Sequence, residues 1–276
     1  MERGQTVSRV MKPVRPTTED YVRVAMITLA CGLLTAAGVS PANAVGCAFE
    51  PQGEGRVRTV IDARSFRLED GREVRLAGIE PVATEKSNDS AALATIIGGR
   101  EVSLRGEDDT PDRYGRQIAF VYLAPSEMPV QGQLLAQGEA LAAGDVADKD
   151  CAAVLATAEA SAREARKGFW ADPAAIKNAE SPGDILTGIG RFTVVEGRVL
   201  SVRQAGATTY LNFGRNWTRD FAVTIPRRML APFEAAGIVL KSLENRRIRV
   251  RGFIEAQRGP RIDVLRVGQI ELVGGK

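Results

Sequence analysis

The first half of the chain is dominated by short segments rich in β-branched residues that turn residues separate. The clearest turn is Glu69-Asp70-Gly71, which joins two such segments as a hairpin turn would. Strands this short bury their apolar faces only by sharing one sheet, so the pattern predicts a small β-barrel. The expected strands lie at residues 56–61, 66–68, 73–79, 101–104 and 117–123.

Three further segments have the apolar and alanine spacing of helices, at residues 84–97, 130–137 and 149–167. Gly138 and Gly168 follow the second and third of them as stop signals. We expect these helices to pack on the barrel. Residues 172–189 contain proline and glycine with weak periodicity, which is typical of a linker.

A second group of strands follows the predicted linker, and a helix at residues 226–240 separates its third strand from its fourth. The expected strands lie at residues 192–202, 208–213, 220–225, 247–254 and 262–270. Five strands with a helix in this place are typical of an OB-fold barrel. The predicted fold class is therefore mostly β with helices (α+β), with domains at residues 45–171 and 190–276.

The first 44 residues have the pattern of a secretory signal peptide. An uncharged apolar run, residues 24–39, follows several basic residues and precedes Ala42-Asn43-Ala44, an A-x-A cleavage site. We expect cleavage after Ala44, a secreted or periplasmic protein, and no membrane span in the mature form. The alternative is an uncleaved N-terminal membrane anchor, for which about 16 apolar residues are short.

Two cysteines remain once the predicted signal has removed Cys31. In an oxidising compartment, Cys47 and Cys151 are expected to form a disulfide, the alternative being two free thiols. The chain contains no histidine. Histidine-dependent catalytic triads and histidine metal ligands are therefore excluded, and a cysteine-rich zinc site is excluded by the cysteine count.

Charge is distributed unevenly along the chain. Residues 45–189 carry 16 Lys and Arg against 24 Asp and Glu, a net charge of −8. Residues 190–276 carry 16 Lys and Arg against 7 Asp and Glu, a net charge of +9. If the protein binds a polyanion, the basic C-terminal half is where we expect it to bind.

Four pieces of the first half resemble one family in the correct order. They are VIDARSFRLEDGREVRLAGIE (60–80), PDRYGRQIAFVYL (111–123), LLAQGEALAA (134–143) and CAAVLATAEASAREARKGFW (151–170). Together they resemble the staphylococcal nuclease (thermonuclease) family over about residues 55–171. The resemblance implies an OB-fold with three helices that cleaves DNA and RNA phosphodiesters with Ca²⁺. In such a site, carboxylates hold the cation and arginines neutralise charge on the phosphate.

The resemblance places family arginines at Arg75 and Arg116, which would contact phosphate, and a substrate-side aromatic residue at Tyr114. Packing or structural roles remain the alternative for these three residues. The carboxylates of the family mostly do not survive. Where the family typically has Asp-Gly-Asp-Thr, this chain has Asp62-Ala63-Arg64-Ser65, so Arg64 replaces a metal-binding aspartate.

The segment that follows the expected strand at residues 73–79 also departs from the carboxylates of the family. Glu80 stands at a metal-binding aspartate, and Ala83 replaces the glutamate that orients water. We expect Arg64 to form an ion pair with Glu80 or Asp62 in place of the metal. The alternative is a rebuilt site in which Glu80 and Asp62 hold the metal and Glu85 acts as the base.

The basic half combines aromatic residues with arginines, the composition of proteins that bind single-stranded nucleic acid. Alternation along 247–251 predicts one outward sheet face for its arginines. The candidate binding residues are Tyr210, Phe213, Trp217, Arg219, Arg247, Arg249 and Arg251.

Taken together, the sequence predicts an exported thermonuclease-like protein with an impaired nuclease site. We expect it to bind single-stranded nucleic acid, another polyanion or a protein partner, and to need no cofactor. The alternatives are an active Ca²⁺-dependent nuclease and a non-catalytic envelope scaffold.

Overall fold

The computed structural model describes residue 47, residues 49–82 and residues 90–274. The described residues all belong to one compact unit, Val45–Lys276. The predicted signal segment, Ala83 and Glu85 lie outside the described residues.

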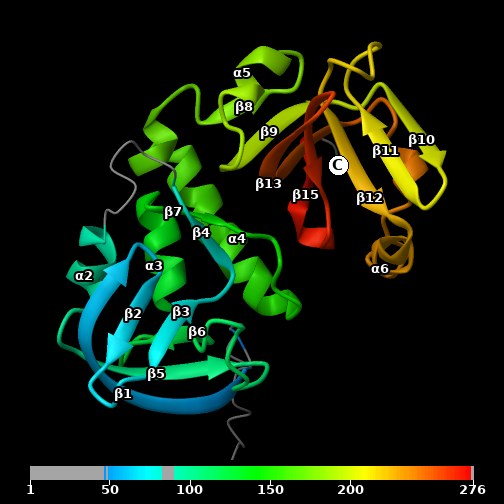
Figure 1. Cartoon of the computed structure of the whole chain (residues 1–276). Coiled ribbons are helices and arrows are strands. Elements are labelled where there is room, and N and C mark those ends of the chain that lie inside the picture. Colours follow the sequence, from blue (N-terminus) through cyan, green and yellow to red (C-terminus); the bar gives the residue numbers. More distant parts are fainter. Residues whose placement is uncertain (1–46, 48, 83–89, 275–276) are drawn as a thin grey trace, which may run out of the picture. The chain divides into compact units, whose positions relative to one another are not determined.

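Five strands of the first half form a sheet that closes into a ring (Figure 1). The ring closes because the long curved strand β1 pairs antiparallel with β2 over one part of its length and with β5 over another. Strands β3 and β6 are the parallel pair in the ring. The strands, in the order β1-β2-β3-β6-β5, are β1 (Glu50–Asp62), β2 (Ser65–Leu68), β3 (Glu73–Leu76), β6 (Gln117–Tyr122) and β5 (Glu101–Gly106).

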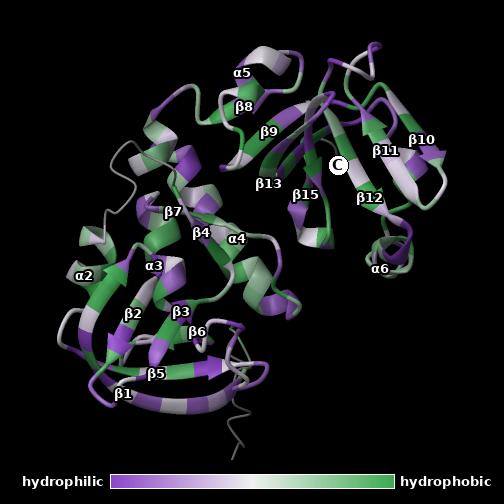
Figure 2. Ribbon diagram, viewed as in Figure 1, coloured by the Kyte–Doolittle hydropathy of each residue, from purple (hydrophilic) through white to green (hydrophobic). Residues whose placement is uncertain are grey.

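Alternation along these strands builds the interior of the ring. Val74 and Leu76 of β3 are buried, whereas Glu73 and Arg75 between them are only partly buried on the opposite face. The described α-helices of this half are α2 (Ala91–Ile97), α3 (Val130–Gln137) and α4 (Lys149–Glu164). Helix α3 has the predicted bounds and packs against α4. Figure 2 shows the polar character of most of β1.

The predicted strand 73–79 is wrong in one respect, because it breaks at Gly78. This residue has a φ of +73°, and a Cβ there would lie 2.7 Å from the Val146 side chain, so glycine is required. After the break the chain forms β4 (Ile79–Pro81), which pairs antiparallel with β7 (Ala140–Ala142). Glu80 lies opposite Leu141 in this pair, so the break fixes where the Glu80 carboxylate points.

The predicted disulfide between Cys47 and Cys151 is present. It joins the segment before β1 to the first turn of α4, across 104 residues of sequence. Closing a loop of this length in the unfolded chain costs entropy, which corresponds to a stabilisation of about 4.7 kcal/mol in the chain-entropy model.

The second half forms a mixed β-sheet with the strand order β10-β11-β12-β14-β13-β9-β8. The sheet is mixed because β12 pairs parallel with β14 and β8 pairs parallel with β9. The strands are β8 (Ile176–Asn178), β9 (Phe192–Arg198), β10 (Ser201–Ala205), β11 (Thr208–Asn212), β12 (Ala222–Pro226), β13 (Arg247–Gln257), β14 (Gly259–Asp263) and β15 (Ile270–Leu272), which pairs with β13. The α+β fold class is confirmed.

The predicted linker, residues 172–189, contains β8 and the short helix α5 (Pro182–Leu186). The expected strand 262–270 is wrong, because it divides into β14 and β15. The Gln269 side chain accepts hydrogen bonds from the backbone nitrogens of Leu265 (2.7 Å) and Arg266 (2.9 Å), and these bonds hold the intervening turn η4 (Val267–Gln269).

The expected helix 226–240 is much shorter than predicted. Its α-helical part is α6 (Leu230–Ala235), between the 3₁₀ turns η2 (Arg227–Met229) and η3 (Leu240–Leu243). Gly237, with a φ of +76°, ends α6 because an α-helix does not continue through a left-handed residue. Among the residues that the structure describes, no helix combines the length and the apolar character needed to cross a bilayer.

Candidate functional site

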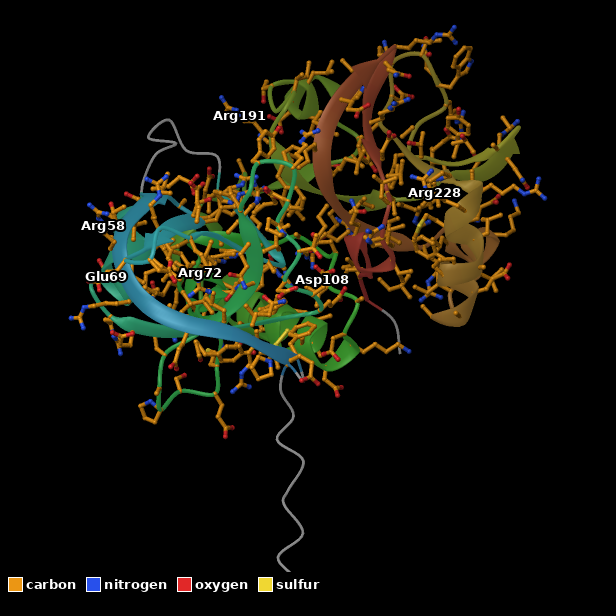
Figure 3. The ribbon with its side chains drawn as sticks, turned by 60° about the horizontal axis from the view of Figure 1, so that its bottom comes forward. Arg58, Glu69, Arg72, Asp108, Arg191 and Arg228 are labelled. Atoms are coloured by element: carbon orange, nitrogen blue, oxygen red, sulfur yellow. A yellow bond between two sulfur atoms is a disulfide. The ribbon has the colours of Figure 1, made fainter. Side chains whose placement is uncertain are left out.

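A cleft of about 820 Å³ opens beside β3, β4 and the turn that precedes β6. Four arginines line it: Arg64, Arg75, Arg113 and Arg116. Five carboxylates line it too: Glu80, Glu107, Asp108, Asp112 and Asp145, of which Asp108 is labelled in Figure 3. The structure therefore brings together four of the predicted site residues, Arg75, Arg116, Glu80 and Tyr114.

Arg64 reaches the cleft from the tight turn between β1 and β2. The Asp62 carboxylate holds this turn, because its Oδ1 accepts a hydrogen bond of 2.8 Å from the backbone nitrogen of Arg64. The guanidinium Nη1 of Arg64 forms an ion pair with Oε2 of Glu80, and it lies 3.4 Å from the carbonyl oxygen of Ile79. The predicted ion pair between Arg64 and Glu80 is thus present.

This ion pair is largely shielded from solvent. The side chain of Arg64 is 18% exposed and that of Glu80 is 16% exposed. Removing either partner would leave the other charge poorly solvated, which is costly in such surroundings. The Glu80 carboxylate therefore balances the charge of Arg64, and the Asp62 carboxylate stabilises the turn between β1 and β2.

Arg75 lies on β3 and approaches the same carboxylate from the other side. Its Nη2 is 4.0 Å from Oε1 of Glu80, so the contact is at the limit of an ion pair. Burial lowers the pKa of the Arg75 guanidinium, and the positive charges of Arg64 and Arg116 lower it further. Three guanidinium groups are thus close enough in this cleft to affect one another.

Arg116 is held by Asp112 within the turn before β6. Nε and Nη2 of Arg116 donate to Oδ2 of Asp112 at 3.0 and 2.7 Å, and Oδ1 accepts from the backbone nitrogens of Tyr114 and Arg116. Hydrogen bonds from the Arg116 side chain are the main cause that lowers the pKa of Asp112 to about 2. The same bond raises the pKa of Arg116.

Tyr114 is the exposed aromatic residue of this turn, and 66% of it is accessible to solvent. The guanidinium carbons of Arg113 and Arg116 lie 4.8 and 4.9 Å from the centroid of its ring. These distances are typical of cation–π contacts, so the arginines hold the ring at the mouth of the cleft. The sequence predicted Tyr114 and Arg116 here but missed Asp112 as the partner of Arg116, although the spacing of four residues was a usable signal.

The described residues of the cleft do not fit a calcium ion. Calcium takes six to eight oxygen ligands, whereas no group of three or more acidic, histidine or cysteine side chains among the described residues could hold a metal. A guanidinium about 4 Å from a divalent cation would be repelled by roughly 8 kcal/mol at an effective dielectric constant near 20. Glu80 and Asp62 are therefore not placed as a pair of metal ligands, and Glu85 lies outside the described residues.

The candidate residues of the basic half divide into two groups. Phe213 is buried in the core of the second sheet, and Arg249 and Arg251 are buried as well. Tyr210 and Trp217 line a second groove, described below, and Arg219 is exposed with its Nε 3.7 Å from Asp220. Arg247 is exposed and forms an ion pair with Glu196 at 2.7 Å.

The prediction of one outward face is wrong for Arg249 and Arg251, because carboxylates surround both guanidinium groups. Arg249 pairs with Glu196 at 2.7 Å and with Glu271 at 2.8 Å. Arg251 pairs with the fully buried Glu159 of α4 at 2.8 Å and donates to the carbonyl oxygen of Ala142 at 2.9 Å. Alternation alone does not distinguish a solvated charged face from a face covered by acidic partners.

The described part of the chain is thus an α+β structure in which a closed ring of strands carries a cleft lined by arginines and carboxylates. Residues 73–172 match the family model of the staphylococcal nuclease homologue (SNase). The chain therefore contains an SNase-family domain. The matched residues include Glu80, Arg75 and Arg116 and begin after Arg64. No curated protein matches the chain.

The bond between Asp112 and Arg116 predicts the pH behaviour of the turn before β6. Because the folded-state pKa of Asp112 lies near 2, below its ordinary value of 3.8, the contribution of the carboxylate to stability is present above pH 3.8 and is lost as pH falls through 2. We expect the carboxyl ¹³C shift of Asp112 to titrate near pH 2 in the intact protein and at a higher pH in Arg116→Ala, because the side-chain hydrogen bonds from Arg116 are the main cause of the lowered pKa. Equal midpoints in the two proteins would contradict this assignment.

Proposed function

We propose that this protein binds nucleic acid and that its SNase domain does not cleave it efficiently. The observation that carries the proposal is the ion pair between Arg64 and Glu80 in the cleft. In this ion pair Arg64 occupies the carboxylate of Glu80, the residue that the family resemblance places at a metal-binding position. The SNase match suggests nucleic-acid binding, and the family typically uses Ca²⁺.

The charges in the cleft do not favour strong binding of a polyanion there. Among the described residues that line it, four arginines face five carboxylates, so these residues give the cleft little net attraction for a polyanion. Arg116 is held in two hydrogen bonds by Asp112, and Arg64 is held by Glu80. Arg75 has the longest ion-pair contact of these three, which makes it the arginine best placed to meet a phosphate.

We further propose that both β-structures are OB-fold barrels. The two sheets share a pattern in which three consecutive antiparallel strands precede a parallel pair, β3 with β6 in the first and β12 with β14 in the second. In each sheet, the next strand in the spatial order is antiparallel to the parallel partner: β5 pairs with β6 in the first, and β13 pairs with β14 in the second. This arrangement is that of a five-stranded Greek-key barrel. An experimental structure in which β9 and β10 belong to separate sheets would overturn this proposal for the second sheet.

The proposed lack of efficient cleavage predicts the outcome of a nuclease assay. Purified protein is incubated with single-stranded DNA or RNA in Ca²⁺, Mg²⁺, Mn²⁺ or EDTA, beside an Arg116→Ala variant prepared in the same way. We expect both proteins to release product at the same background rate in every condition, because a lost base alone removes roughly 10²- to 10⁴-fold in rate. Metal-dependent cleavage that Arg116→Ala abolishes would sink the proposal and favour an active nuclease.

We also infer that the protein is exported, with a disulfide suited to an oxidising compartment. The apolar run at residues 24–39 and the Ala42-Asn43-Ala44 site support removal of residues 1–44. Mass spectrometry of the protein from the periplasmic or secreted fraction is expected to show a chain that begins at Val45 without free thiols. Recovery in the membrane fraction with residues 1–44 retained would favour the anchored alternative.

A further inference from the structure

The second sheet carries a groove of about 1170 Å³ on the face opposite its core. Alternation along β11 produces this division, because Thr209 and Leu211 are buried whereas Tyr210 and Asn212 between and beside them face the groove. Tyr210 lies at the floor, opposite Arg203 of β10 and Thr224 of β12 in the strand register. The groove is distinct from the SNase cleft and shares no lining residue with it.

Trp217 stands at the wall of the groove with 64% of its surface exposed. Its loop is fixed, because the Asp220 carboxylate accepts a hydrogen bond of 2.8 Å from the backbone nitrogen of Asn216, and the carbonyl oxygen of Asn216 accepts one from the backbone nitrogen of Asp220. The guanidinium carbon of Arg258 lies 4.7 Å from the centroid of the indole ring. One side of the ring is thus in contact with Arg258, and the exposed remainder is available for stacking.

Three exposed arginines line the groove without a close carboxylate partner. Within the described part of the chain, no carboxylate lies within 4.0 Å of the guanidinium nitrogens of Arg203, Arg215 or Arg258, although the charge of Arg203 helps to lower the pKa of Glu244. The carboxylate that lines it, Asp220, is occupied by its own loop. This differs from the SNase cleft, where arginines and carboxylates are nearly equal in number.

We propose that this groove binds single-stranded nucleic acid, with bases stacked on Trp217 and Tyr210 and phosphates on Arg203, Arg215 and Arg258. A rigid aromatic residue beside unpaired arginines fits a strand whose bases are accessible. A duplex hides the faces of its bases and would use the arginines alone. The inference rests on the proposed nucleic-acid binding and assigns it to a site outside the SNase domain.

Anisotropy of a fluorescently labelled oligothymidylate measures this binding directly. We expect Trp217→Ala to weaken binding by roughly 5- to 150-fold, since stacking on one aromatic residue contributes to that extent. A double variant, Arg203→Ala with Arg215→Ala, is expected to lower the slope of log affinity against log salt by about 1.4, since each phosphate contact on a single strand contributes about 0.7. Far-UV circular dichroism of each variant verifies that the fold is retained.

Arg228→Ala is the matched control. Arg228 is exposed, lies in η2 of the same half and does not line the groove (Figure 3). Arg228→Ala removes one positive charge, as Arg203→Ala and Arg215→Ala each do, but outside the groove. It is therefore expected to change affinity less than threefold. Intrinsic fluorescence gives a second readout, because Trp170 is 5% exposed and Trp217 is 64% exposed. Quenching by the oligonucleotide should disappear in Trp217→Phe.

Several outcomes would overturn the assignment. If Arg75→Ala abolishes binding and Trp217→Ala has no effect, nucleic acid binds in the SNase cleft, and the proposed function stands without the groove. If Arg228→Ala weakens binding as much as a groove variant, the effect is general charge attraction. If the protein binds anionic lipid vesicles and no oligonucleotide at low salt, both this inference and nucleic-acid binding fail, whereas the nuclease assay still decides catalysis separately.

Discussion

The guanidinium of Arg64 is largely enclosed in the cleft, so its charge must be balanced where it lies. Glu80 provides that balance, and several local features serve the pairing. The Asp62 carboxylate shapes the turn that carries Arg64, the break at Gly78 separates β3 from β4, and the pairing of β4 with β7 holds Glu80 in register. A metal ion at this place would need the Glu80 carboxylate free of Arg64. In this protein the guanidinium of Arg64 takes the place of the cation.

Pairing of buried charges also explains why the basic half has less free charge than its composition indicates. Arg249 and Arg251 are neutralised by Glu196, Glu159 and Glu271. Glu159 also accepts a hydrogen bond of 2.8 Å from the backbone nitrogen of Ala142, in the strand that pairs with β4. Arg203, Arg215 and Arg258 of the groove have no ion pair among the described residues, whereas Arg261 of the same groove pairs with Glu255 and Asp263. The three arginines without ion pairs make this groove the stronger candidate for binding a polyanion.

Much of the fold could be predicted from the sequence, because periodicity and stop signals act locally. Helix α3 has the predicted bounds since Gly138 ends it, and the ion pair of Arg64 followed from a cation placed at a carboxylate position beside Glu80. The division of residues 262–270 into two strands depends on one glutamine side chain that bonds to backbone nitrogens, which has no periodic signature. The burial of Arg249 and Arg251 depends on carboxylates distant in the sequence, so alternation could not reveal it.

Calcium titration calorimetry tests most directly whether Arg64 occupies the place of a metal ion at Glu80. We expect the purified protein to show no saturable Ca²⁺ binding tighter than about 1 mM, the weak limit of extracellular calcium modules, and Glu80→Gln to give the same flat titration. Saturable binding with a Kd clearly below about 1 mM that Glu80→Gln abolishes would contradict this expectation.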